Sequence, residues 1–230
     1  MSHISQLVQS VDMLYTRQQA QLMWDAVPYN DSREFAFFTG NKWLHPKQYF
    51  ATCEQFYDFI KTHFVKDVHV KALNDNGGRE WVIDVDFKDR DEAVLLAKIL
   101  LAKDVFVNFF GDNVSRIMHS GNRGLHVWLR IDRFRLSADR SVRQKYYKTF
   151  VAPKFVRMSQ LQPGSFAHAI HQAVLSNPSI VQQYFSSKSI EETLLSVWPA
   201  VDQHVFCNFN QIRAPFSYNF KGRKFSYSLL

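Results

Sequence analysis

The chain has 230 residues, of which 46% are hydrophobic and 21% charged, a balance that excludes an intrinsically disordered protein. With 8 glycines and 7 prolines, a collagen-like or linker-rich protein is excluded as well. The 28 Lys and Arg outnumber the 21 Asp and Glu, so the net charge of +7 favours a polyanionic partner. No run of eighteen apolar residues is present, and we therefore expect no membrane span and no membrane partner.

The two cysteines, Cys53 and Cys207, lie far apart and in no CxxC pattern, whereas a zinc ribbon needs about four closely spaced ligands. This usage predicts buried thiols in a reducing compartment and no zinc site. Residues 1–9 have neither the basic nor the apolar region of a secretory signal. We therefore expect an intracellular protein.

The N-terminal third of the chain alternates between helical and strand-like patterns. Thr16 stands where an N-cap is needed before a helical stripe, and Gly40 with Asn41 is a turn signal between two β-prone runs. The expected elements are a helix over residues 17–27, strands over 34–39 and 42–44, a helix over 53–63 and a strand over 67–73. The turn residues at 74–78 then predict a hairpin whose return strand covers 80–87.

In the rest of the chain, Asp91 is expected to open a helix that runs to about residue 101. The elements predicted after it are a strand over residues 105–110, a strand pair over 115–118 and 124–131, a mostly helical segment over about 137–198 and a strand-like tail from 200. Because strands and helices mix in both halves, we expect an α/β (mixed α+β) fold. No repeat or linker divides the chain, which predicts a single domain over residues 1–230.

The first candidate site is the strand Trp-Val-Ile-Asp-Val-Asp-Phe at residues 81–87. Side chains alternate between faces along a strand, so Asp84 and Asp86 share one face. Two neighbouring carboxylates repel each other and lose hydration, whereas a bound divalent cation removes both penalties. Oxygen ligands suit Mg²⁺ or Mn²⁺. For so short a pattern, a solvated strand face is the simpler interpretation.

The second candidate is Ser-Gly-Asn-Arg-Gly-Leu-His-Val-Trp at residues 120–128. Its two glycines allow close backbone approach, and Ser120, Arg123 and His126 supply donors that suit the phosphates of a nucleotide. An ordinary basic hairpin turn is the alternative. The fixed spacing of these donors before an apolar strand makes the phosphate site the more specific interpretation.

Two residues near the C-terminus could complete such a site. Asp202 follows Trp-Pro-Ala-Val and could be a third carboxylate for a metal pair, and Arg213 could be a further phosphate ligand. Taken alone, an Asp at the start of a strand is usually a cap or turn residue.

The order of these motifs resembles that in the catalytic subunit of the archaeo-eukaryotic primases. The motifs are the Asp-x-Asp strand, the Ser-to-Trp segment and a late Asp before Arg-Ala-Pro-Phe-Ser. The resemblance covers about residues 20–225, and residues 29–37 and 77–87 are most similar to the baculovirus late expression factor members. It implies a primase catalytic core with an RRM-like half and a helical segment. It also implies DNA replication through short RNA primers, made from NTPs on a single-stranded DNA template.

The resemblance implies roles for individual residues. Asp84, Asp86 and Asp202 would hold two divalent ions, Mg²⁺ or Mn²⁺. The residues implied for binding the triphosphate are Arg33, Ser120, Arg123, His126 and Arg213. At Asn122 and Asn219 the chain departs from the family, which often has Arg and His there, and Lys221 or Arg223 could compensate. A separate accessory (large) subunit in a heterodimer is implied too, and, for a viral protein, the host nucleus.

A basic run with interleaved aromatic residues lies between residues 130 and 157 and could bind the template strand. The residues expected to contact single-stranded DNA are Arg133, Arg135, Arg143, Lys145, Lys148 and Arg157. A solvated helix face over a buried aromatic one explains the same pattern equally well.

Three other functions remain open at this stage. A primer-extending repair-type polymerase of the same fold would share every motif, so only substrate assays separate it from a primase. A non-catalytic single-stranded DNA-binding protein would have no use for clustered carboxylates, which repel phosphates unless a cation is bound. A two-metal nuclease would not need the donors of the segment at 120–128.

Overall fold

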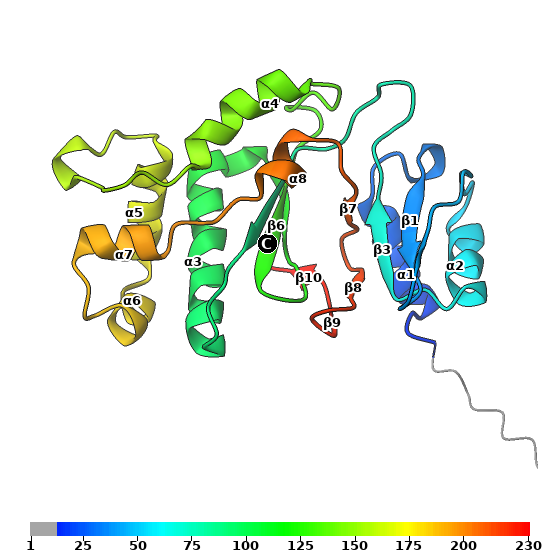
Figure 1. Cartoon of the computed structure of the whole chain (residues 1–230), viewed down its shortest axis with the longest axis horizontal. Coiled ribbons are helices and arrows are strands. Elements are labelled where there is room, and N and C mark those ends of the chain that lie inside the picture. The colour runs from blue at the N-terminus through cyan, green and yellow to red at the C-terminus, as the bar shows by residue number, and fades with distance from the viewer. Residues whose placement is uncertain (1–12) are drawn as a thin grey trace, which may run out of the picture.

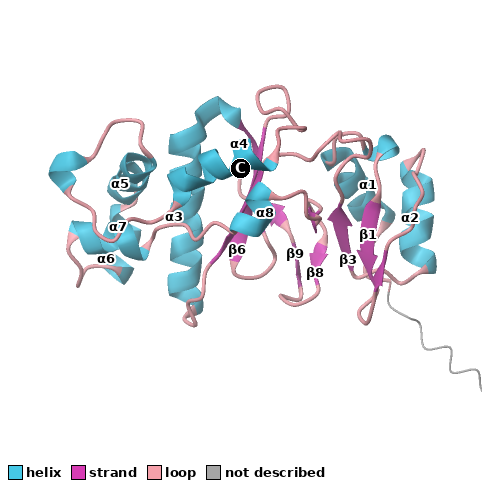
Figure 2. Ribbon diagram, turned by 45° about the horizontal axis from the view of Figure 1, so that its top comes forward, coloured by secondary structure: helices cyan, strands magenta, loops and turns pink. Residues whose placement is uncertain are grey.

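The structure is a computed structural model that describes residues 13–230. Its helices and strands form two four-stranded antiparallel sheets, flanked by helices (Figures 1 and 2). The first sheet has the order β2 (Trp43–Leu44), β1 (Phe35–Phe38), β3 (Asp67–Val70), β7 (Ile212–Arg213). The second has the order β10 (Tyr227–Ser228), β5 (Val114–His119), β6 (Gly124–Leu129), β4 (Val82–Asp86). The predicted mixed α+β class is confirmed.

The first sheet packs against two helices, α1 (Arg17–Ala26) and α2 (Cys53–Thr62). Thr16 caps α1 in a capping box, because its side chain accepts the Gln19 N–H while the Gln19 side chain accepts the Thr16 N–H. The predicted hairpin also forms, with Phe37 opposite Leu44. These elements match the predicted ranges to within two residues at each end.

The second sheet has a different core on each of its faces. Alternate residues, among them Ile83, Val85 and Val127, pack on the side of α3 (Glu92–Phe110). Val82 and Trp128 point the other way and join the core of the first sheet. The second sheet therefore lies between α3 and the first sheet (Figure 1). Asp84 and Asp86 share the face of Val82, so they point toward the first sheet.

The segment predicted to be mostly helical contains α4 (Arg140–Tyr147), α5 (Phe166–Ser176), α6 (Pro178–Tyr184) and α7 (Ile190–Ser196). Short 3₁₀ turns cover Asn30–Ser32, Gly111–Asn113, Lys148–Phe150 and Met158–Gln160. A small ribbon of β8 (Tyr218–Asn219) and β9 (Lys224–Phe225) lies between the two sheets (Figures 1 and 2). Within residues 13–230, no helix is both long and apolar enough to cross a bilayer.

One predicted strand is wrong, and two others form with a different partner or extent than expected. Residues 105–110 are the last turns of α3, because periodicity alone cannot distinguish a helix from a strand in a continuous apolar run. Residues 80–87 do not return against β3, since β4 pairs with β6 and the turn closes only as a bridge between Leu73 and Gly78. The tail from residue 200 begins with a helix, α8 (Gln203–Cys207), before its short strands.

Candidate active site

The two central acidic and basic motifs meet across one pair of strands. In the β4–β6 register Asp84 lies opposite His126, and Asp86 lies opposite Gly124. A Cβ at Gly124 would lie 1.7 Å from the carbonyl oxygen of Val85, so only glycine allows the strands to approach this closely. Gly121, at φ +76°, is likewise crowded by the backbone of Lys224. The close backbone approach expected at these two glycines is therefore an approach of the protein's own chain.

Asp202 reaches the same place from the other side of β4. A bridge joins Val85 to Val201, and the Asp202 N–H donates to the Asp84 carbonyl over 2.8 Å. The Asp202 carboxylate also accepts the N–H groups of His204 (2.7 Å) and Val205 (3.0 Å), so it caps α8. The two interpretations of this residue are therefore compatible, since it is a helix cap and it lines the same cavity as Asp84.

The carboxyl group of Asp84 is electrostatically costly to ionise. Burial raises its pKa to about 7, and the charges of Asp202 and Asp86 contribute to the rise. The ring of His126 lies 3.5 Å from Asp84 Oδ1, but burial and the nearby Arg213 lower the pKa of His126 to about 3. His126 is therefore neutral at pH 7, and its contact with Asp84 is not an ion pair.

Arg213 is fixed by a residue that the sequence analysis missed. Asp67 on β3 accepts two hydrogen bonds from this guanidinium, Nε to Oδ1 at 3.0 Å and Nη2 to Oδ2 at 2.8 Å. His69 Nε2 lies 3.3 Å from the same carboxylate. Burial would raise the pKa of Asp67, but His69 and Arg213 outweigh it and hold the pKa below its usual range. The alternation in Asp-Val-His-Val places Asp67 and His69 on one face, which was the available signal.

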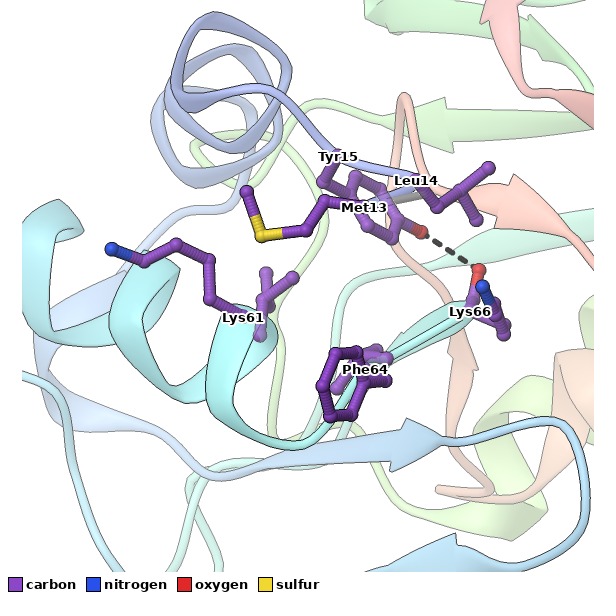
Figure 3. A pocket seen from close by; sticks show the side chains of 8 residues that line it. Met13, Leu14, Tyr15, Lys61, Phe64 and Lys66 are labelled. Atoms are coloured by element: carbon purple, nitrogen blue, oxygen red, sulfur yellow. Dashed lines mark hydrogen bonds between the residues drawn. The ribbon is translucent and has the colours of Figure 1, made fainter. Parts of the chain in front are cut away.

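A second layer of hydrogen bonds supports this pair. Ser217 Oγ lies 3.4 Å from Asp67 Oδ1 and 3.1 Å from the hydroxyl of Tyr15. Tyr15 donates to the Lys66 carbonyl over 3.0 Å (Figure 3) and accepts the Tyr218 N–H. The pocket beside Tyr15 in Figure 3 has a volume of about 10 Å³, room for about one water molecule, so it is no substrate site.

The acidic and basic side chains described above, from Asp84 to Arg213, line one cavity of about 620 Å³, which is within the usual range for ligand sites. The predicted residues that line it are Asp84, Asp86, Asp202, Ser120, Arg123, His126 and Arg213. The lining residues that were not predicted are Phe38, Trp43, Asp67, His69, Val85 and Phe220. Asn122 and Asn219, noted for their departure from the family pattern, line it as well, and so does Lys221, which was noted as a residue that could compensate.

Asp86 and Arg123 are paired with each other. Arg123 Nη2 lies 2.8 Å from Asp86 Oδ2, and both side chains are about half exposed, at 47% and 50%. In residues 13–230, no three His, Cys, Asp or Glu side chains are already arranged to hold a metal ion. An exposed ion pair contributes only about 0–1 kcal/mol, so the Asp86 carboxylate can leave Arg123 at little cost. Three carboxylates, one of them with a raised pKa, are a donor set that fits Mg²⁺ or Mn²⁺.

The family departure at Asn219 has a structural explanation. Its side chain donates to the Ser120 carbonyl over 2.9 Å and accepts the N–H groups of Lys221 and Gly222, both at 3.1 Å. Asn219 therefore ties the β8–β9 turn to the segment at 120–128. Lys221 from this turn lines the cavity, whereas Arg223 is absent from the lining residues of that cavity.

Arg33 does not line the cavity, so the expectation of a direct nucleotide contact is wrong. Its side chain is fully buried and pairs with Glu80 over 2.5 Å, while it also donates to the carbonyls of Pro28 and Lys71. Arg33 lies two residues before β1, and Glu80 lies two residues before β4. The ion pair of Arg33 and Glu80 thus links the two chain segments that lead into β1 of the first sheet and β4 of the second sheet.

Arg143 is not a template contact either. It is fully buried and donates to the carbonyls of Arg79 (2.6 Å) and Leu136 (3.1 Å), with its guanidinium 4.7 Å from the centre of the Trp81 ring. The other members of the predicted template surface are exposed: Arg133, Arg135, Lys145, Lys148 and Arg157. Arg133 and Arg135 line a separate cavity of about 430 Å³. For these five residues, template binding stays a prediction.

Comparison with known proteins gives three matches. A family model described as DNA primase small subunit matches residues 83–228, which include all seven predicted cavity residues. A DNA primase of Autographa californica nuclear polyhedrosis virus is 45% identical over 217 residues, covering 92% of this chain and 80% of that protein. Late expression factor 1 of Orgyia pseudotsugata multicapsid polyhedrosis virus is 43% identical over 219 residues, covering 92% of this chain and 86% of that protein.

Proposed function

The chain belongs to the DNA primase small subunit family, and from this we propose that it makes short RNA primers on single-stranded DNA by two-metal nucleotidyl transfer. Family membership confirms the resemblance found in the sequence, the similarity to baculovirus proteins and the enzyme class. The finer steps below are our proposal.

One observation carries the proposal. The three carboxylates of Asp84, Asp86 and Asp202 line the same cavity as three phosphate-binding types of side chain, Ser, Arg and neutral His. These residues come from β4, the β5–β6 turn, β6 and two C-terminal segments. A cavity that only bound nucleic acid would have no use for the carboxylates, which repel phosphate. A nuclease would not need so many donors for a triphosphate.

The triphosphate is bound by cations of two kinds. Arg213 is held by Asp67 in one orientation, so its position costs little entropy when a nucleotide binds. Arg123 and Lys221 are exposed and can turn toward the β- and γ-phosphates. His126 is neutral and buried, and its one N–H can donate a hydrogen bond to a phosphate oxygen without adding charge.

Asp84, Asp86 and Asp202 would hold the two divalent ions, which when bound lower the pKa of the 3′-hydroxyl and neutralise charge on the α-phosphate and the leaving group. In the transfer itself, the 3′-oxygen forms a bond to the α-phosphorus while the bond from that phosphorus to the β-phosphate oxygen breaks. The hydroxyl proton passes to water and pyrophosphate leaves. Arg213 and Arg123 stabilise the negative charge that collects on the leaving pyrophosphate.

The setting and partners are proposed on the same basis. Membership in a family described as a small subunit supports an accessory large subunit on another chain, and the two viral relatives support a role in the nucleus of an infected cell. Nucleoside triphosphates and a DNA template follow from the family.

The test is de novo synthesis on single-stranded DNA with labelled NTPs and Mg²⁺ or Mn²⁺. We compare the wild type with Asp84→Asn and, as a matched control, with Asp132→Asn, an exposed carboxylate that pairs with Arg130. We expect short RNA products from the wild type and the control, and at least a hundredfold loss in Asp84→Asn.

Three results would overturn the proposal. Extension of a supplied primer without de novo products would indicate a repair-type polymerase. Cleavage of the DNA would indicate a nuclease. Binding of DNA with no synthesis, even with a candidate large subunit added, would indicate a non-catalytic binding protein.

A further inference from the structure

A second, larger cavity of about 800 Å³ lies next to the turn between β5 and β6. Its walls come from the loop at 88–90, the first half of α3, the end of β5 and the C-terminal strands β9 and β10. His119 lines it, and along β5 this side chain points to the same face of the sheet as Ile117, the face covered by α3. This groove and the active-site cavity therefore lie on opposite faces of the second sheet, and Asn122 and Arg123 in the turn line both.

The groove contains a prepared aromatic surface. Tyr227 of β10 lies directly opposite His119 of β5, and their rings stack with centroids 4.7 Å apart and an angle of 11° between planes. His119 Nδ1 accepts the Gly121 N–H over 2.9 Å, and this hydrogen bond fixes the orientation of the His119 ring. His119 is only 7% exposed, whereas Tyr227 is 45% exposed and lines the groove. Leu96, 48% exposed, adds apolar surface nearby.

Positive charge surrounds this surface. Lys88, Arg90 and Lys224 line the groove and are exposed, and they come from two segments far apart in the sequence. The groove also contains Asp89, but Lys98 neutralises it with contacts of 2.8 and 3.0 Å. Glu92 is the other acidic residue of the lining. The balance is positive, as a phosphate backbone requires.

We propose that this groove binds a single strand of nucleic acid, with a base stacked on Tyr227 and the backbone phosphates on Lys88, Arg90 and Lys224. Exposed aromatic faces combined with lysine and arginine along a groove are what single-strand binding uses. The cations come from two separate segments, and the groove is larger than the active-site cavity, which favours a strand over a free nucleotide. A strand leaving the groove passes the turn at Arg123 and enters the active-site cavity.

The groove competes directly with the surface at residues 130–157 as the site for the strand. On that surface Arg143 is buried and therefore cannot contact a strand. Its exposed Tyr146 packs against Trp81 in a T-shaped arrangement. Its separate cavity shares no lining residue with the active-site cavity, whereas the groove shares two. The inference that a nucleic-acid strand occupies the groove rests on the proposed function. Binding of that strand can nevertheless be measured in the absence of primer synthesis.

The experiment measures binding of a fluorescein-labelled 12-nucleotide oligo(dT), and of oligo(U), to the full chain by fluorescence anisotropy. Tyr227→Ala should weaken binding about tenfold, while Tyr227→Phe should bind like the wild type. The matched control is Tyr146→Ala, because this tyrosine on the competing surface is also exposed, at 54% against 45% for Tyr227. Thermal unfolding of each variant checks that β10 remains in place.

Charge reversal gives a second, independent readout. Lys224→Glu should weaken binding about fivefold and reduce the slope of log Kd against log salt by about 0.7, the value for one phosphate contact on a single strand. The control Lys145→Glu should leave the affinity within twofold. A preference for oligo(dT) identifies the strand as template and a preference for oligo(U) as primer; both support the groove.

The proposal is overturned if the wild type binds neither oligonucleotide, or if Tyr146→Ala and Lys145→Glu weaken binding while the Tyr227 and Lys224 variants do not. Primer synthesis by the same variants tests the proposed function separately. Asp84→Asn should bind the strand like the wild type while synthesis is lost. Loss of strand binding in Tyr227→Ala, in a protein that makes no primers, would retain the groove and reject the primase mechanism.

Discussion

The active-site cavity contains two Asp–Arg pairs that differ in almost every respect. The pair of Asp67 and Arg213 joins two strands of the first sheet through two hydrogen bonds, with side chains 5% and 15% exposed. The pair of Asp86 and Arg123, at the edge of the second sheet, has one contact of 2.8 Å and is half exposed. A buried pair is costly to break and an exposed one is not. The first therefore fixes a cation in place, and the second leaves both of its groups available to ligands.

The largest effect that separates the two pairs is on stability. Asp67→Asn leaves the Arg213 charge without its partner and should lower the free energy of unfolding by about 3 kcal/mol. Asp86→Asn should change it by less than about 1 kcal/mol. Urea unfolding followed by circular dichroism measures both. Equal losses in the two variants would show that the pairs do not differ as described.

The second-largest effect is expected on nucleotide binding, when either arginine of the two pairs is replaced by lysine. Arg213→Lys cannot make the two parallel hydrogen bonds to Asp67, so the cation loses its fixed position, and we expect KM for NTPs to rise about tenfold. Arg123→Lys, at the flexible pair, should raise KM by no more than about threefold. Steady-state primer synthesis at varied NTP concentration measures both. A larger effect at Arg123 would contradict the distinction between the two cations.

Acid should weaken the buried pair specifically. The pKa of Asp67 is lower in the folded protein than its unfolded value of about 3.9, so the folded state binds this proton less tightly. Its contribution to stability is complete above that unfolded pKa and is lost as the pH falls through the lower folded value. The stability difference between the wild type and Asp67→Asn should therefore shrink below about pH 4. A constant difference from pH 7 to pH 3 would assign the stabilisation to packing.

The smallest effect concerns the turn that carries Lys221. Asn219→Ala removes the hydrogen bond that ties the β8–β9 turn to the Ser120 carbonyl and two hydrogen bonds within that turn. We expect a loss of about 1–2 kcal/mol in stability and a KM for NTPs raised about twofold, as Lys221 loses its support. Asn122→Ala is the control, because Asn122 lines the same cavity without making these bonds. Equal changes in both variants would remove the supporting role of Asn219.

How far the sequence predicts the site depends on whether the signal is local. Asp84 and Asp86 were predictable because a period of two in an apolar strand places both on one face. The same period places Asp67 and His69 on one face, but the pairing of Asp67 with Arg213 was not predictable. Arg213 lies 146 residues away, and nothing in the sequence indicates that β3 and β7 are neighbours. The fold shows the same limit, as the turn at 74–78 was recognised but the sheet that the following strand joins was not.

Buried arginines set a second limit. Arg33 and Arg143 look like nucleotide or template ligands in the sequence, because basic residues near a polyanion site are ordinarily exposed. In the structure each guanidinium donates to carbonyl groups brought together by the fold, and that of Arg33 also pairs with Glu80. A sequence pattern contains no information on which carbonyls will be left to accept such bonds.

The proposed chemistry depends on a cation site formed by Asp84, Asp86 and Asp202, which thermal unfolding with and without Mn²⁺ at pH 7.5 would detect. Without metal, Asp84→Asn should be more stable than the wild type by about 1–2 kcal/mol, because it removes a buried charge repelled by its neighbours. Saturating Mn²⁺ should raise the Tm of the wild type by several degrees and leave that of the variant unchanged. If Mn²⁺ raised both melting temperatures equally, the three carboxylates would not be the cation site.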